Sequence, residues 1–200
     1  MSEPVTPALL ITPLKAALLQ GMAQTVTALV RVRAPNASEV VAAARTTTNV
    51  ALVIDRSGSM DGAALQEAVR CAGRLQLTLA APEGVRLQVL NDLPSAVRDG
   101  FLVVALPDLA YGAEAWVVVE LQVSAALAAG TPLSLLKVAA SATTPDGLPL
   151  AFHDTALHLP ALPPAAFEVV LADPLVAARK AELDASDLLQ QARDAAAHGH

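Results

Sequence analysis

The sequence predicts a mainly β protein, an antiparallel β-sandwich built from segments on both sides of an inserted strand–turn–helix, with a helix at the C-terminus. Three observations support this fold class. Short apolar runs recur along most of the chain, turn residues separate them, and no helical pattern of ten or more residues intervenes between residues 76 and 165. Short strands with regular punctuation are typical of an antiparallel sandwich, whereas a parallel sheet requires alternating strands and helices.

The expected strands form two blocks. The N-terminal block contains runs at 8–18 and 25–35, and small or β-branched residues alternate along the second run. The later block contains five runs, at 85–90, 101–106, 115–123, 133–142 and 148–159. Turn signals such as Asp99-Gly100 and Pro145-Asp146-Gly147 lie between these runs. We therefore predict that residues 1–48 and 76–165 share one sandwich.

Residues 49–75 have a different pattern. An apolar run at 50–54 leads into a Gly-containing turn that carries Asp55, Ser57 and Ser59, and a helix is expected over 62–75. One carboxylate and two hydroxyls on alternate residues form a cluster of hard oxygen ligands, which suits Mg²⁺ or Mn²⁺.

This turn, Asp55-Arg56-Ser57-Gly58-Ser59, resembles the D-x-S-x-S motif of the metal-ion-dependent adhesion site (MIDAS) of von Willebrand factor A (vWA) domains. The resemblance implies that residues 49–75 are a remnant of a vWA domain whose other βα units are missing. It also implies that Asp55, Ser57 and Ser59 hold the metal, and that an acidic side chain of a protein partner completes its coordination. The family takes a further Thr and Asp from later loops, and no acceptable match for them is found, so the expected site is incomplete.

Residues 166–200 are expected to form a C-terminal unit with one long helix. Asp173 is a good N-cap residue, and Pro174 suits the first helical position. An apolar stripe follows, and Lys180 and Asp184 have the spacing of a helical ion pair. The stripe consists of Leu175, Ala178, Ala181, Ala185, Leu188 and Ala192. Such a helix either binds a partner or docks on its own domain, and the sequence leaves both alternatives open.

Composition narrows the class of protein. The net charge of −6, without a basic cluster, argues against nucleic-acid binding. The apolar stretches are shorter than the ~20 residues of a membrane-spanning helix. A single cysteine suits a reducing compartment, so a cytoplasmic location is expected, and the Ala-rich, Arg-over-Lys composition hints at a bacterial source.

No catalytic motif is found, which favours a non-enzymatic protein-interaction module of the vWA type. Two alternatives remain at this point: a structural or assembly scaffold with an inert motif, and a truncated vWA protein without independent activity. A strand at 50–54 that is apolar on both faces would need cover from another chain. We therefore expect a homo-oligomer with residues 49–80 in its interface, unless the C-terminal helix folds back to cover this segment.

The incomplete ligand set generates a first prediction. Because Mg²⁺ prefers six oxygens in octahedral geometry, we expect Mg²⁺ and Mn²⁺ to bind more weakly than millimolar, a free energy below about 4 kcal/mol. Isothermal titration calorimetry measures this affinity. A micromolar Mn²⁺ site that Asp55→Ala abolishes would contradict the prediction.

Overall fold

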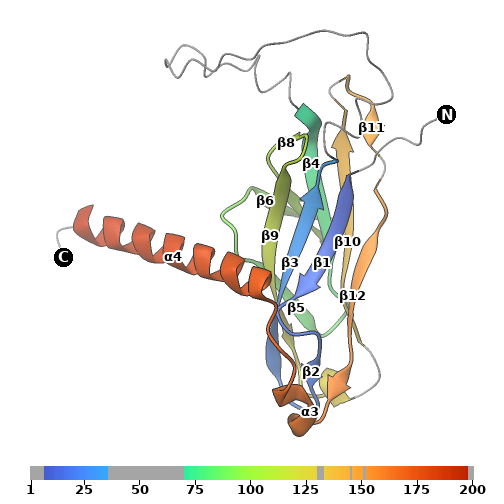
Figure 1. Ribbon diagram of the computed structural model, residues 1–200, viewed down its shortest axis with the longest axis vertical. Helices are drawn as coiled ribbons and strands as arrows, with labels where there is room; N and C mark the ends of the chain where they lie inside the picture. Colours follow the sequence, from blue (N-terminus) through green and yellow to red (C-terminus); the bar gives the residue numbers. More distant parts are fainter. Residues whose placement is uncertain (1–6, 36–69, 130–132, 145, 151, 198–200) are drawn as a thin grey trace.

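The computed structural model describes residues 7–35, 70–129, 133–144, 146–150 and 152–197. Within these ranges, two sheets of antiparallel strands pack against each other as a sandwich, and a long helix leaves its side (Figure 1). The predicted fold class, a mainly antiparallel β protein with a C-terminal helix, is confirmed.

The smaller sheet has four strands in the order β1-β3-β9-β5. The strands are β1 (Ala8–Pro13), β3 (Gln24–Arg33), β9 (Glu114–Val123) and β5 (Val85–Val89). At its centre β3 and β9 pair over their full length, from Gln24 opposite Val123 to Arg33 opposite Glu114. Both strands contain runs of consecutive buried residues, at 26–30 in β3 and 117–119 in β9, because they lie at the centre of the sheet and are covered on both faces.

The larger sheet runs β11-β10-β4-β7-β6, with β12 added to β10 and β8 to β4. Its strands are β4 (Arg70–Ala80), β6 (Ser95–Arg98), β7 (Phe101–Ala105), β8 (Leu109–Ala110), β10 (Leu133–Thr143), β11 (Pro149–Leu150) and β12 (Thr155–Leu159). Two predicted turns are confirmed as hairpin connections. Asp99 and Gly100, both at positive φ, join β6 to β7, and a turn at Asp146-Gly147 joins β10 to β11.

Short elements close the lower end of the sandwich. β2 (Leu18–Leu19) pairs in parallel with β13 (Ala161–Leu162), which ties the start of the chain to its last third. A 3-10 helix, η1 (Leu127–Ala129), lies close by, since the Gly21 N–H donates to the Ala128 carbonyl. The chain then passes through α3 (Pro164–Glu168) into α4 (Pro174–Ala197). No helix of the described residues is long and apolar enough to cross a membrane.

The main core lies between the two sheets. Its fully buried members are all Ala, Val or Leu and include Val30, Val117, Leu77, Val104 and Leu136. Each comes from the inward-facing positions of an alternating strand, as period-2 patterning requires. The aromatic-poor composition therefore produces a core of aliphatic side chains that interdigitate.

One expected element is wrong in part. The helix predicted for 62–75 cannot include its last six residues, because Arg70 to Leu75 belong to β4, which pairs with β10 and β7. Leu75, Leu77 and Leu79 alternate along β4 and are buried in the chain's own core. Those three side chains are thus covered within one chain, and the expected oligomer interface over residues 49–80 stays a prediction. Residues 49–69 lie outside the described residues, and the predicted division of the chain into 1–48 with 76–165, 49–75 and 166–200 stays a prediction.

The placement of β4 generates a second prediction. Leu77 is 0% exposed, so Leu77→Ala should lower the free energy of unfolding by about 2–5 kcal/mol through lost burial and a residual cavity. Val97 on β6 is 74% exposed, and Val97→Ala should change it by less than about 0.5 kcal/mol. Urea denaturation of both variants tests this, and equal effects would contradict the placement of β4 in the core.

Candidate protein-interaction surface

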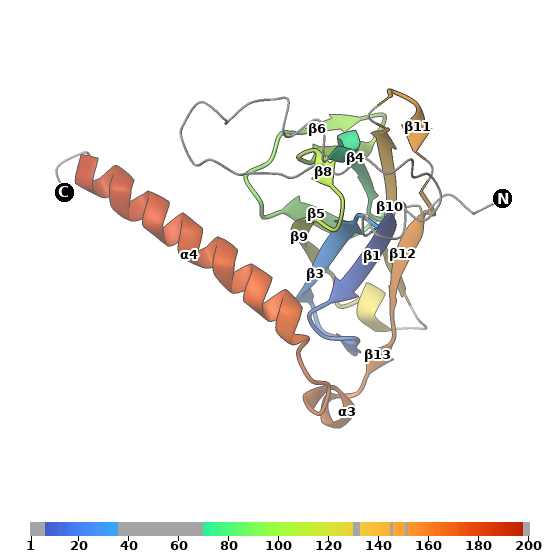
Figure 2. The same ribbon diagram turned by 45° about the horizontal axis from the view of Figure 1, so that its top comes forward.

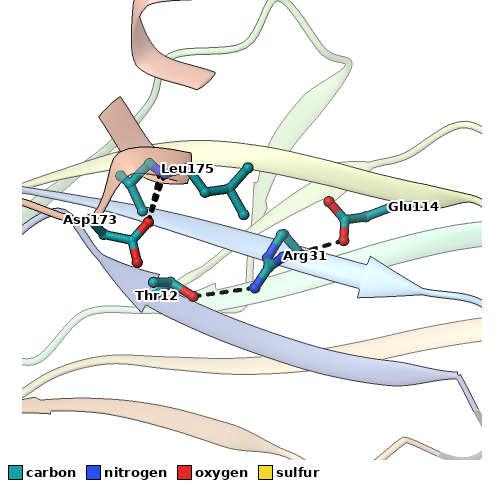
Figure 3. A network of polar contacts seen from close by, with 6 residues as sticks. Thr12, Arg31, Glu114, Asp173 and Leu175 are labelled. Atoms are coloured by element: carbon teal, nitrogen blue, oxygen red, sulfur yellow. Dashed lines mark hydrogen bonds and ion pairs between the residues drawn. The ribbon is translucent and has the colours of Figure 1, made fainter. Parts of the chain in front are cut away.

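Helix α4 begins at a well-formed N-terminal cap. Asp173 Oδ1 accepts hydrogen bonds from the backbone N–H groups of Leu175 and Val176, each at 3.0 Å, as predicted for an N-cap residue (Figure 3). The Asp173 N–H in turn donates to the Leu14 carbonyl at 2.7 Å, immediately after β1. The cap therefore fixes both where the helix starts and where it meets the smaller sheet.

The first turns of α4 cover the outer face of the smaller sheet with a second, small core. We call this the helix-dock cluster. Leu29 on β3, Val118 on β9 and Val176 on α4 are each 0% exposed at its centre. Leu14, Leu90, Trp116 and Leu183 are partly buried around them. Leu29 and Val118 are direct partners in the β3–β9 register, so the docking site is a single cross-strand pair.

Two cations of α4 hold the helix against the same face. The Arg179 guanidinium lies over the Trp116 ring, 4.7 Å from its centroid, and Lys180 Nζ lies 3.7 Å from Glu120 Oε1 of β9. Lys180 also bonds Asp184 at 3.0 Å, which confirms the predicted i, i+4 ion pair. The hydrogen bond to Asp184, with help from Glu120, raises the pKa of Lys180 above its ordinary value.

A separate group of polar contacts links β1, β3 and β9 in the part of the same sheet that α4 does not cover. Arg31 on β3 pairs with Glu114 on β9 at 3.4 Å and donates to Thr12 Oγ1 on β1 at 3.5 Å (Figure 3). The charges of Arg31 and Glu114 are therefore neutralised by each other within the sheet.

Beyond Leu183 the helix leaves the sandwich, and the sequence explains why. Val176, Arg179, Lys180 and Leu183 lie on the sheet-facing side of α4. At helical spacing the next residues on this side are Asp187, Gln190 and Asp194. Their side chains are polar and cannot extend the apolar contact with the sheet. From Asp184 to Ala197 every residue is exposed, and the helix points away from the body in both views (Figures 1 and 2).

The opposite side of α4 is apolar along most of its length. We call it the outer stripe, and it consists of Ala178, Ala181, Ala185, Leu188, Leu189, Ala192 and Ala196. At about 100° per residue these positions occupy roughly a third of the circumference, with no polar residue among them. All seven are exposed, and Leu188 and Leu189 are 65% and 60% exposed.

The spacing of apolar residues in the sequence therefore predicts the outer stripe but not the helix-dock cluster. The expected stripe, which runs from Leu175 to Ala192, is exposed throughout, while docking falls to Val176 and Leu183. The signal for the dock was present in the i, i+3, i+7 spacing of Val176, Arg179 and Leu183, although a charged residue interrupts it. Trp116 was missed because its strand predicts only alternation, not which face receives a helix.

A second surface feature lies on the outer face of the larger sheet. A shallow groove of about 310 Å³ runs beside Phe101, which is 45% exposed. Its floor is formed by small side chains such as Thr78, Ala80 and Ala139, with Lys137 and Asp154 at its sides. The described lining contains no histidine or cysteine, and its residues do not indicate a particular chemical function.

The predicted metal ligands Asp55, Ser57 and Ser59 lie outside the described residues. Among the residues that the structure describes, no three His, Cys, Asp or Glu side chains are grouped so as to hold a metal ion. His153 and His158, near β12, are exposed.

No protein-family model matches the chain, and no curated protein matches it. Similar solved structures include a non-cellulosomal cohesin from the hyperthermophilic archaeon Archaeoglobus fulgidus, at 11% identity and TM-score 0.40, over 82% of this chain and 98% of that one. A cohesin module from a family 33 glycoside hydrolase of Clostridium perfringens has 9% identity and TM-score 0.41, over 78% and 98%. The full-length major pilin SpaD from Corynebacterium diphtheriae has 11% identity and TM-score 0.42, over 75% and 34%.

These comparisons correct the family assignment. The similar structures are cohesin modules and a pilin, none is a vWA protein, and no family model supports vWA. The resemblance of 49–62 to a vWA segment with a MIDAS motif is therefore wrong as an assignment of this chain. A five-residue pattern of Asp and Ser after an apolar run is too short to identify a family without the rest of its fold. At such low identities and TM-scores, the likeness is one of β-sandwich arrangement alone.

The helix dock generates a third prediction. Val176→Asp places a carboxylate between the fully buried side chains of Leu29 and Val118, and the cost of removing that charge from water should detach α4 from the sheet. A detached helix of this length is marginal in water, so helical circular dichroism should fall. Trp116, the only tryptophan, should shift its emission to longer wavelength.

Gln190→Asp is the matched control, because it adds the same charge to an exposed position of the same helix that lies outside both the helix-dock cluster and the outer stripe. It should leave Trp116 emission and the helical signal unchanged. Equal spectra for Val176→Asp and the unmodified protein would show that the helix is not held by this cluster.

Proposed function

We propose that this protein is a non-enzymatic protein-interaction module, in which the sandwich serves as a platform and the outer stripe of α4 contacts another protein. The exposure of Leu188 and Leu189 on a helix that is anchored at one end and directed away from the body carries this proposal. Contiguous apolar surface on a soluble protein commonly marks an interface, and amphipathic helices bind partners through apolar side chains at such spacings.

The construction of α4 supports the same function. Its first turns pack on the sheet through Val176 and Leu183, whereas every residue from 184 to 197 is exposed. Isolated helices of that length are marginal in water, so an end with this composition gains stability from a bound partner. The docked turns orient the free part before binding, which lowers the entropy lost on association.

The alternative of a structural or assembly subunit is a special case of this proposal, because such a subunit uses the same stripe on a partner of its own assembly. A cytoplasmic location and weak Mg²⁺ or Mn²⁺ binding by Asp55, Ser57 and Ser59 stay predictions.

A photo-crosslinking amino acid in place of Leu188 tests the proposed function. We expect irradiation to give an adduct with one protein species that peptide mass spectrometry identifies, in the purified chain or in cells that produce it. The same amino acid in place of Gln190, two residues away on the polar side of the helix, is the control and should give little product.

The adduct from position 188 should disappear when Leu189→Asp is added, because that charge interrupts the stripe. An absence of adducts, or identical adducts from positions 188 and 190, would mean that the stripe is not an interaction surface.

A further inference from the structure

We propose that the partner of the outer stripe is a second copy of this chain, bound so that two α4 helices lie antiparallel about a two-fold axis. This inference rests on the proposed function and names its partner. It is carried by the charges that border the stripe, which complement one another in one register of such a pair.

The stripe has two flanks of polar residues. Glu182 and Arg193 lie along one flank, and Asp184 and Gln191 lie along the other, at about 100° of rotation per residue. In an antiparallel two-fold pair, each flank meets the same flank of the second helix. Glu182 can therefore face Arg193 of the second copy, and Asp184 can face Gln191 of the second copy.

Both of these contacts require the same register. Glu182 and Arg193 are equidistant from the midpoint between Asp187 and Leu188, and so are Asp184 and Gln191. A two-fold axis through that midpoint forms two ion pairs and two hydrogen bonds at once, and no like charges of the flanks face each other. Glu182 is accessible for this contact, since its side chain is 55% exposed although it already pairs with Arg179.

The apolar residues fit the same axis. Leu188 and Leu189 lie next to the midpoint, where they meet their own symmetry mates. The alanines on each side, Ala185 and Ala192, alternate along the axis with those of the second copy. Small residues allow helix axes to approach to about 8 Å, the short end of the range for packed helices. Residues 178–197 overlap in this register, a contact about 30 Å long at 1.5 Å per residue.

The opposite orientation of the helices is disfavoured. In a parallel two-fold pair, each flank meets the other flank at the same height, so Glu182 would lie beside Asp184 of the second copy. Like charges at an interface oppose association. A parallel pair would also bring the two sandwiches together at one end of the helices.

The sandwich leaves room for the antiparallel pair. The outer stripe lies on the side of α4 opposite to the helix-dock cluster, and Ala178 and Ala181 are exposed even where α4 is docked. A second helix can lie along the full stripe without displacing the sheet. The two sandwiches then lie at opposite ends of the pair, which gives an elongated dimer.

Sedimentation equilibrium of the full chain at micromolar concentrations tests the dimer. We expect Glu182→Arg and Arg193→Glu to weaken it by about tenfold each, because each creates two repulsive contacts per dimer. The double variant E182R/R193E should restore it. Asp187→Arg on the polar, sheet-facing side has the same change of charge as Glu182→Arg and should leave the dimer unchanged.

A disulfide tests the register independently of affinity. With Cys71→Ser as background, Leu188→Cys places two thiols beside the two-fold axis, and we expect a covalent dimer on air oxidation. Gln190→Cys should form no covalent dimer under the same conditions. Equal disulfide formation at 188 and 190 would overturn the proposed register.

The outcomes separate this inference from the proposed function. A chain that stays monomeric, while a crosslinker at position 188 captures a different identified protein, would reject the dimer and retain the interaction surface. A monomeric chain without any adduct would reject both.

Discussion

The pairing of β3 with β9 is the constraint on which the rest of the structure depends. Its inward residues, among them Val30 and Val117, form the centre of the main core, while Leu29 and Val118 on the outward side form the centre of the helix-dock cluster. Burial on both faces is common for parallel sheets and less so for antiparallel ones. One strand pair thus determines where the sheets meet and where α4 begins.

Much of the fold could be predicted because its strands are short, apolar and separated by strong turn residues. The turn at Asp99-Gly100 and the helix cap at Asp173 depend only on residues close by in the sequence, so both could be predicted from it. β4 was partly misread because Leu75, Leu77 and Leu79 alternate at period 2 directly after residues with helical spacing. The resemblance to a vWA domain favoured extending the helix to residue 75. The pairing of β4 with β10 joins residues that are 57 to 70 positions apart, from Ala80 with Lys137 to Gly73 with Thr143, and local spacing does not predict such a nonlocal contact.

The sequence predicts the apolar pattern of the candidate interaction surface but not its position relative to the sandwich. The stripe along α4 could be read from spacing, since Ala and Leu recur on one side of the helix. Which side docks depends on two tertiary contacts, Arg179 with Trp116 and Lys180 with Glu120, that no local rule supplies. The docking side of α4 contains only two apolar anchors, Val176 and Leu183, because stacked and paired cations provide the remaining contact.

The parallel pairing of β2 with β13 has a consequence for how the chain is made. Leu18 of β2 pairs with Ala161, and the carbonyl of Leu14 accepts a hydrogen bond from the N–H of Asp173, so these groups reach their partners only after residues 161–173 have been synthesised. On the ribosome β2 therefore stays without its strand partner until residues 161–162 emerge, whereas β3 finds its partner β9 already at residues 114–123. Such late closure of nonlocal contacts slows folding and leaves strand edges exposed to aggregation during synthesis.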